Sequence, residues 1–408
     1  MSPSFETLSS LKQYGFRIYL GNYLSEMANH DIRWVVQSLL IYRLTGSVAM
    51  LGILSLVNAV PGILLPLAGG VIADRLPKKL VLNLGQIGAL VPSLIVAVSL
   101  SFGWLSAERA GSWWILMVAS FINTSTMSLT VPARQSIISE LVGKEHIMNA
   151  ISLRSTAYNI LHLGVPALAG VIVDKFGFAS VYYIMVVLSL IGLIFTLFLP
   201  KFTVQIKKGQ SALSQLKDGF LYARRETHIL FIMIFTMLVA VLMTPYTKLL
   251  PVYVDDILKV GATGYGLMLS ASAVGGIVGA LIIASIPSKK RGFILLIDVA
   301  ALGLALMIFA FSRNWYFSLA VVVLIGLAQP ARYTVSNSLV QSYTEHSYQG
   351  RMMSIYSLQD GIFNLGGFVA AMVAGLITTP WTVFSFALVM VLLSLFSMAF
   401  FPKIRNLD

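Results

Sequence analysis

The sequence predicts an all-α integral membrane protein with twelve transmembrane helices in two pseudo-symmetric six-helix bundles. Three observations predict this fold class: long apolar spans fill almost the whole chain, few residues are charged, and the basic residues gather on one side of the spans. A helix needs about 20 largely apolar residues to cross a bilayer. The predicted spans begin near Phe16, Ser47, Leu80, Gly111, Ala150, Gly177, Thr227, Thr263, Gly292, Trp315, Met352 and Trp381.

The composition excludes several function classes. Hydrophobic residues make up 57% of the chain and charged residues 11%, a balance that a soluble core cannot absorb. The chain has no Cys, so we expect no disulfide, thiolate metal site or thiol redox chemistry. The sequence also lacks a phosphate-binding loop, a nucleophile elbow and metal-spaced His, Asp and Glu. We therefore expect no cofactor, no metal site, no catalytic residues and no enzymatic activity.

The net charge of +12 could indicate a nucleic-acid partner, but the positions of the basic residues argue against one. Most of the 28 Lys and Arg residues lie in one set of loops and span ends. The opposite loops are predicted to hold only Arg43, Arg109, Lys175, Lys248, Lys259 and Arg313. By the positive-inside rule the richer loops and both termini are cytoplasmic. A bacterial cytoplasmic (inner) membrane is the expected location.

The longest polar segment divides the spans six and six. We predict an N-terminal bundle over residues 1–200, a cytoplasmic linker over 201–226 and a C-terminal bundle over 227–408. In the linker, apolar residues have helical spacing beside basic residues, and they are Leu213, Leu216, Phe220 and Leu221. This pattern is typical of an amphipathic helix on the inner membrane surface. A solvated linker helix is the alternative.

Short sequence motifs recur at equivalent places in the two halves. Pro132-Ala133-Arg134 ends the fourth span, and Pro330-Ala331-Arg332 ends the tenth. Ser152-Leu153, Asn159 and Gly170 likewise recur as Ser357-Leu358, Asn364 and Gly375. These matches indicate a half-chain duplication. Two parallel six-helix repeats with a central linker resemble the architecture of the major facilitator transporters.

A loop motif strengthens this resemblance. Gly70-Val-Ile-Ala-Asp74-Arg75-Leu-Pro-Lys78-Lys79, between the second and third spans, resembles the major facilitator signature Gly-x-x-x-Asp-Arg-x-Gly-Arg/Lys-Arg/Lys. Only Pro77 departs from it, in place of the second Gly. The resemblance implies a cytoplasmic gate in which Asp74 meets the positive N-terminal end of the eleventh span. An ordinary basic loop is the alternative.

Further words are similar to the drug and siderophore exporter branch of that superfamily, which includes macrolide and enterobactin efflux proteins. These words include Tyr42-Arg43-Leu44-Thr45-Gly46-Ser47, Pro132-Ala133-Arg134-Gln135 and Leu250-Pro251-Val252-Tyr253. This resemblance implies export of hydrophobic or amphipathic small molecules by alternating access. It also implies that spans one, four, seven and ten line the substrate cavity. The cavity candidates are Asn22, Arg33, Gln37, Asn123, Met233, Met237 and Tyr246.

The first span carries an unusual polar face. Its polar residues recur at helical spacing, and they are Tyr19, Asn22, Glu26, Asn29, His30, Arg33 and Gln37. A charge at the bilayer centre costs at least about 2.5–3.5 kcal/mol, so each must face the bundle interior, a partner or water. This face is therefore the predicted site of the transport chemistry.

Glu26 is the leading proton-coupling candidate, because a buried carboxylate beside His30 and Arg33 could exchange a proton when access switches. A static Glu26–Arg33 pair is the alternative. Arg33 is expected to be a counter-charge unless the substrate is an anion. Asp31 points elsewhere on the helix and, with Asp360 in the eleventh span, is a further candidate. His162 is expected to be packed or hydrogen-bonded rather than a ligand.

These observations predict a proton-coupled exporter (antiporter) that works as a monomer. Its expected partners are an amphipathic small molecule, protons and the lipid bilayer, with no nucleic acid. An importer or uniporter of a defined solute on the same fold is one alternative. A non-transporting membrane sensor or scaffold is another, although such a protein would be expected to carry a larger soluble domain.

Overall fold

The computed structural model describes residues 8–200, 202, 212–286, 289–345, 348–405 and 407. Within these ranges it leaves undescribed the side chains of residues 67–75, 135, 144, 212–217, 331 and 403–404. The described residues form helices and turns, with no β-strand among them. The all-α prediction is therefore confirmed.

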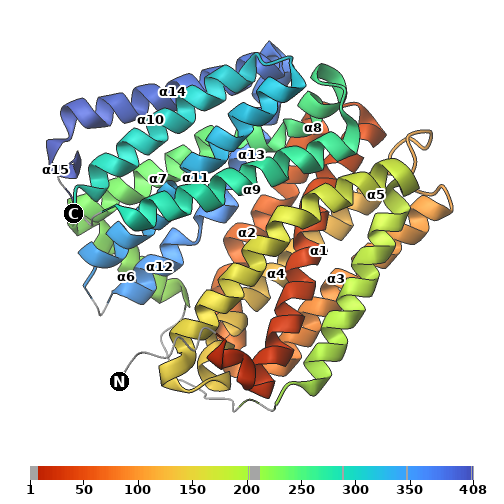
Figure 1. Cartoon of the computed structure of the whole chain (residues 1–408), viewed down its shortest axis with the longest axis horizontal. Coiled ribbons are helices and arrows are strands. Elements are labelled where there is room, and N and C mark those ends of the chain that lie inside the picture. Colours follow the sequence, from red (N-terminus) through yellow and green to blue (C-terminus); the bar gives the residue numbers. More distant parts are fainter. Residues whose placement is uncertain are drawn as a thin grey trace. The chain divides into compact units, whose positions relative to one another are not determined.

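Figure 1 shows the order of the helices along the chain. The first half contains α1 (Tyr14–Thr45), α2 (Val48–Arg75), α3 (Lys78–Ser101), α4 (Trp114–Leu141) and α5 (Ile147–Phe198), with short helices at Ser9–Lys12 and Lys144–His146. The linker helix α6 covers Ala212–Arg225. The second half contains α7 (Thr227–Lys248), α8 (Leu250–Val252), the π-helix η3 (Tyr253–Ile257), α9 (Gly261–Ser285), α10 (Arg291–Ala310), α11 (Trp315–Tyr343), α12 (Gln349–Tyr356), α13 (Gln359–Ile377), α14 (Thr379–Phe400) and α15 (Pro402–Arg405).

The described helices account for twelve spans. Eleven of these spans lie in ten helices that are long and apolar enough to cross a membrane, with α12 and α13 counted as one broken helix. One of the ten, α5, is two helices that meet at Gly177, where φ is 78° and ψ is 171°. The remaining span is α1, which is 32 residues long and is more polar than the other ten helices. The twelve-helix prediction is confirmed.

Two compact units make up the chain. The first contains Met1–Gln37 and Leu64–Gly209, and the second contains Ser38–Ile63 and Gln210–Asp408. Helix α1 thus passes from the first unit to the second after Gln37, and α2 returns after Ile63. The second unit includes the segment 38–63 in addition to the C-terminal helices. The proposed division at residues 200 and 227 stays a prediction.

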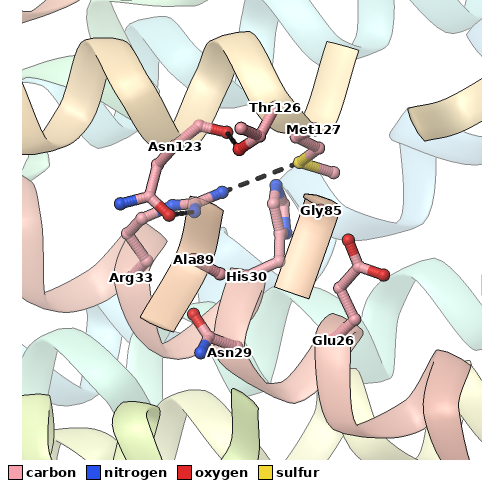
Figure 2. A pocket seen from close by; sticks show the side chains of 9 residues that line it. All are labelled: Glu26, Asn29, His30, Arg33, Gly85, Ala89, Asn123, Thr126 and Met127. Carbon is pink, nitrogen blue, oxygen red and sulfur yellow. Dashed lines mark hydrogen bonds between the residues drawn. The ribbon is translucent and has the colours of Figure 1, made fainter. Parts of the chain in front are cut away.

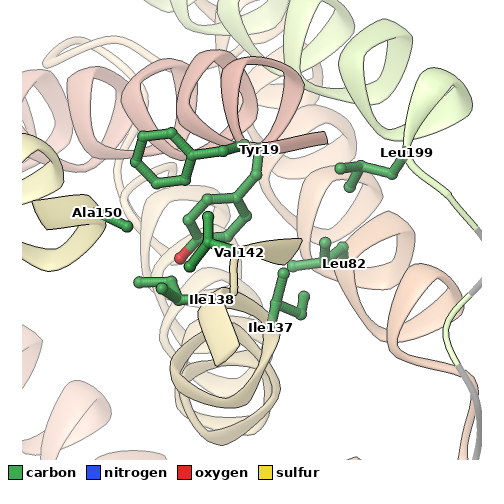
Figure 3. Packing of buried hydrophobic residues seen from close by; sticks show 8 residues of the cluster. Tyr19, Leu82, Ile137, Ile138, Val142, Ala150 and Leu199 are labelled. Atoms are coloured by element: carbon green, nitrogen blue, oxygen red, sulfur yellow. The ribbon is translucent and has the colours of Figure 1, made fainter. Parts of the chain in front are cut away.

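A buried cluster fixes one end of the first unit (Figure 3). Its members come from α1, α3, α4, α5 and the residues that follow α4 and α5, and they are Phe16, Tyr19, Leu82, Ile137, Ile138, Val142, Ala150 and Leu199. Tyr19 is fully buried, and its hydroxyl donates a 3.2 Å hydrogen bond to the carbonyl oxygen of Arg134. The cluster therefore holds the C-terminal end of α4, which is predicted to face the cytoplasm, against α1.

Close packing of α3 on α4 positions the wall of a pocket. A Cβ atom added at Gly88 would lie 2.2 Å from the Thr126 Cγ2 atom, so only glycine fits there. Small residues let transmembrane helices approach in this way. The approach places Gly85 and Ala89 of α3 opposite Thr126 and Met127 of α4.

The same backbone turn joins the last two spans of each half. Gly177 in α5 has φ 78° and ψ 171°, and Thr378 between α13 and α14 has φ 81° and ψ 155°. This conformation favours glycine, because a side chain there is strained. Its recurrence at equivalent places supports the duplication that the sequence indicates.

Candidate functional site

A pocket with polar walls lies inside the first unit and is lined by α1, α3 and α4 (Figure 2). It holds about 260 Å³ of empty space, part of it open to solvent. The polar face of α1 provides Glu26, Asn29, His30 and Arg33, and the other walls are Gly85, Ala89, Asn123, Thr126 and Met127. Four residues of the predicted polar face thus meet in one place.

Glu26 forms an ion pair with Arg134 of α4. Both side chains are nearly buried, with 11% of Glu26 and 5% of Arg134 exposed. Nη2 of Arg134 also donates to the Thr130 hydroxyl at 2.5 Å. The sequence suggested Arg33 as the neighbour of Glu26, but Arg134 on the neighbouring helix α4 binds the carboxylate instead.

Arg33 turns away from Glu26 toward α4. Its Nη1 donates a 2.7 Å hydrogen bond to Asn123 Oδ1, and its Nη2 lies 3.6 Å from the Met127 sulfur. Figure 2 shows the His30 ring between Arg33 and Glu26. The pocket therefore has a paired carboxylate at one end and a cation with neutral acceptors at the other.

Asp31 is not part of the pocket wall and lies at the centre of a second polar cluster. Its carboxylate is 2% exposed. One oxygen lies 3.0 Å from His162 Nδ1 of α5, and the other lies 3.4 Å from His30 Nδ1. The Tyr158 hydroxyl donates to the second oxygen at 3.5 Å. Because His30 also lines the pocket, it links this cluster to the site of Glu26.

Two predicted cavity residues lie elsewhere in the first unit. Asn22 is fully buried, and its amide donates at 2.8 Å to both Gly192 O and Thr196 Oγ1 of α5. It anchors α1 to α5 and does not line the pocket. Gln37 is 8% exposed and is also absent from the pocket wall. A helical stripe can contain both pocket residues and packing residues.

The cavity candidates of the second half lie in the second unit. Met233 and Tyr246 of α7 are 4% and 3% exposed, and the Tyr246 ring meets Phe309 edge-on at 5.1 Å. Met237 is half-buried on the same helix. Asp360 is exposed in the first turn of α13, and its carbonyl oxygen accepts from the Asn364 amide at 2.9 Å.

The gate motif is only partly described. The side chains of Gly70, Asp74 and Arg75 lie outside the described residues, although their backbone belongs to α2. Lys78 forms an ion pair with Glu140 at the end of α4. Lys79 donates to the carbonyl oxygens of Leu197 and Leu199 at 2.7 and 3.1 Å. These carbonyls lie at the C-terminal end of α5, where the helix dipole favours a cation. Both lysines therefore bind neighbouring helix ends.

The loop position predicted for Lys248 was wrong. The seventh span continues as α7 through Pro245 to Lys248. There Lys248 Nζ donates a 2.8 Å hydrogen bond to Asn364 Oδ1 and lies 5.3 Å from the Phe363 ring centre. A proline in a transmembrane helix is tolerated when neighbouring groups satisfy the backbone, so Pro245 does not end the helix.

Sequence reasoning also missed a polar contact in the second unit. Arg43, at the end of α1, donates to both carboxylate oxygens of Asp255 in η3, at 2.9 Å each. The neighbouring Tyr42 hydroxyl donates to Asp256. Two adjacent acids directly after an apolar span were the available signal. These contacts join the segment 38–63 to the C-terminal helices.

Comparison with known proteins gives concordant results. The family model described as transmembrane secretion effector matches residues 5–408. A staphyloferrin A transporter of Staphylococcus aureus is 24% identical over 362 residues, which cover 88% of this chain and 87% of that protein. The enterobactin exporter EntS of Salmonella choleraesuis is 25% identical over 320 residues, or 75% of this chain and 74% of that one. A crystal structure of the nucleoside transporter NupG has a TM-score of 0.80 and 16% identity, and covers 95% of this chain and 99% of that one.

The likeness to the nucleoside transporter shows the fold. The family model is one of the major facilitator superfamily, so this chain with its apolar spans is a multi-pass membrane protein of that superfamily. Within that superfamily, the chain belongs to the transmembrane secretion effector family, because the family model matches nearly its whole length. The resemblance to the drug and siderophore exporter branch is confirmed. The relatives are named transporters, which also confirms that the chain is not an enzyme.

Proposed function

We propose that this protein exports hydrophobic or amphipathic small molecules, such as siderophores or drugs, by proton-coupled alternating access. Two relatives support this substrate class, one named a staphyloferrin A transporter and the other an enterobactin exporter. The proposal places the protein in a bacterial cytoplasmic membrane, as a monomer with both termini in the cytoplasm. The charge bias of the loops supports that orientation.

The observation that carries proton coupling is the Glu26–Arg134 pair at the pocket. A nearly buried ion pair stabilises the conformation that contains it only while Glu26 is ionised. Protonation neutralises the carboxylate, removes the attraction to Arg134 and lets α1 and α4 separate. A proton and a substrate that favour different conformations are thereby coupled.

Asp31 and His30 support Glu26 in this proposal. His30 lies in the pocket wall and also lies 3.4 Å from Asp31, which His162 contacts from α5. A histidine between two carboxylates can hold a proton that is leaving or reaching either one. Asp360 in α13 is a further proton-coupling candidate in the second half.

Alternating access needs contacts that break on one side of the membrane at a time. The Arg43–Asp255 and Tyr42–Asp256 contacts are the candidates for the outer side. On the cytoplasmic side, the motif of Gly70, Asp74, Arg75, Lys78 and Lys79 is the proposed gate. Asp74 would meet free backbone amides of the eleventh span when that gate is closed.

Transport by purified protein in liposomes tests the proposal. A panel of amphipathic dyes and antibiotics is offered with and without an imposed pH gradient. Glu26→Gln is expected to abolish gradient-driven movement while leaving substrate binding measurable. Glu145→Gln is the matched control, because that carboxylate is 72% exposed and lies outside the pocket. Gradient-independent movement by the unaltered protein would instead identify a uniporter or facilitator.

A further inference from the structure

Arg33 lies in the middle of a membrane-spanning helix, and no described acidic side chain forms an ion pair with it. Its guanidinium donates to the amide oxygen of Asn123 and lies against the thioether sulfur of Met127. Among the side chains that the structure describes, the nearby acids are bonded to other groups: Glu26 to Arg134, and Asp31 to His162 and His30. The expected Glu26–Arg33 pair is therefore not formed, because Arg134 takes that place.

A charged group at this depth needs a partner, water or a functional reason to be there. The pocket gives Arg33 such a reason, because its guanidinium lies in the wall with both terminal nitrogens directed at neutral acceptors. A neutral amide and a thioether are weak acceptors for a guanidinium compared with a carboxylate. An anion in the pocket would balance the positive charge of Arg33.

We propose that Arg33 binds a carboxylate of the substrate and that the transported molecules are amphipathic organic anions. This inference rests on the proposed transport function and names its substrate class. A carboxylate has two oxygens that match the two terminal nitrogens of a guanidinium, so it replaces Asn123 and Met127 as the acceptor. Gly85, Ala89 and Met127 give the apolar part of the molecule a wall to lie against.

The other charges of the pocket agree with this assignment. Glu26 would repel an anion if it were unpaired, but Arg134 neutralises it. His30 stands between Glu26 and Arg33 in Figure 2 and adds either no charge or a positive one. A cationic amphiphile would meet Arg33 without compensation, so the pocket selects against it.

An anionic substrate also agrees with outward transport. A membrane potential that is negative inside favours the outward movement of each negative charge by roughly fiftyfold per 100 mV. Exchange of one substrate anion for one proton would then move two charges per cycle in the favoured direction. Export of such a molecule draws on the potential as well as on the pH gradient.

Binding of a matched pair of probes tests the inference without any gradient. Pyrenebutyrate and pyrenebutyramide have the same ring and chain and differ in the terminal carboxylate or amide. Fluorescence titration of the protein in lipid nanodiscs at neutral pH gives the ratio of their affinities. A charge-assisted, two-point contact predicts at least about tenfold preference for the carboxylate. Equal binding, or preference for the amide, would overturn the proposal.

Substitutions then assign the preference to Arg33. Arg33→Gln is expected to bring the ratio close to one. Asn123→Asp is expected to do the same while retaining Arg33, because it places an internal carboxylate on the guanidinium. The matched control is Arg17→Gln, which removes an exposed Arg from the same helix and should leave the ratio unchanged. A ratio that persists in Asn123→Asp, or in a folded Arg33→Gln protein, contradicts the assignment.

The binding and transport results separate the two claims. A carboxylate preference without gradient-driven movement would uphold the anion site and remove proton-coupled export. Gradient-driven movement without a carboxylate preference would leave export in place and remove the anion site.

Discussion

The two halves of the protein place the same three residues in different surroundings. Pro132-Ala133-Arg134 and Pro330-Ala331-Arg332 both lie within the fourth helix of a repeat, and both arginines are buried, at 4% and 1% exposure. In the first unit, Arg134 pairs with Glu26 and donates to Thr130. The first helix of that half provides the acid, so the arginine becomes part of a site.

Arg332 in the second unit has no such pair among the described residues. Its guanidinium lies 4.0 Å from the Tyr333 ring centre, and its Nε and Nη2 atoms are buried without a hydrogen-bond partner there. Asp298 of α10 interacts with it electrostatically, but Oδ2 of Asp298 also lacks a hydrogen bond within the described chain. Of the two arginines, Arg134 has an acidic partner bonded to it, whereas the described residues provide no such partner for Arg332.

The largest expected difference is in stability. Arg134→Met leaves the Glu26 carboxylate nearly buried and unpaired, which should lower the free energy of unfolding by about 3–5 kcal/mol. Arg332→Met removes a cation whose nitrogens are partly unsatisfied, so its cost should be at most about 1 kcal/mol. Denaturant unfolding in detergent measures both. Equal losses would show that the two arginines have equivalent surroundings.

Adding Glu26→Gln to Arg134→Met sharpens this comparison. The second change removes the unpaired charge, and about 2 kcal/mol of the lost stability should return. Asp298→Asn added to Arg332→Met should change stability by less than about 1 kcal/mol, because these two described side chains form no ion pair at contact distance. Failure of Glu26→Gln to restore stability would indicate that Arg134 acts through packing.

The sequence predicted the elements of the site better than their pairing. The polar stripe of α1 identified Glu26, His30 and Arg33, since periodicity depends only on neighbouring residues in one helix. It could not assign Arg134 to Glu26, because that contact depends on the rotation of α4 against α1. Asn22 fits the same stripe but donates to α5. The span count was predictable from hydropathy, whereas the continuation of α7 to Lys248 depended on how its proline was accommodated.

A smaller effect is expected at the Arg43–Asp255 pair, which is more exposed than the Glu26–Arg134 pair, at 32% and 17% of the two side chains. An exposed ion pair contributes up to about 1 kcal/mol. Arg43→Gln should therefore shift the equilibrium between closed and open states of the outer gate by about fivefold toward the open state. The chain has no Cys, so a single Gln37→Cys reporter can be labelled with a maleimide that does not cross membranes. Labelling from the outer side should accelerate about fivefold. An unchanged rate would exclude this pair as an outer gate.

The smallest expected effect separates the two turns that Gly177 and Thr378 occupy. Both have a positive φ near 80°, but only Thr378 carries a side chain in this strained conformation. Thr378→Gly should therefore stabilise the protein by roughly 0.5–1 kcal/mol, since relief of strain exceeds the added freedom of the unfolded chain. Gly177→Ala should destabilise it by a similar amount, and a Cβ atom there would meet nothing within 4 Å, so backbone strain alone is responsible. Thermal unfolding measures both, and shifts of the same sign would mean that the two turns are not equivalent.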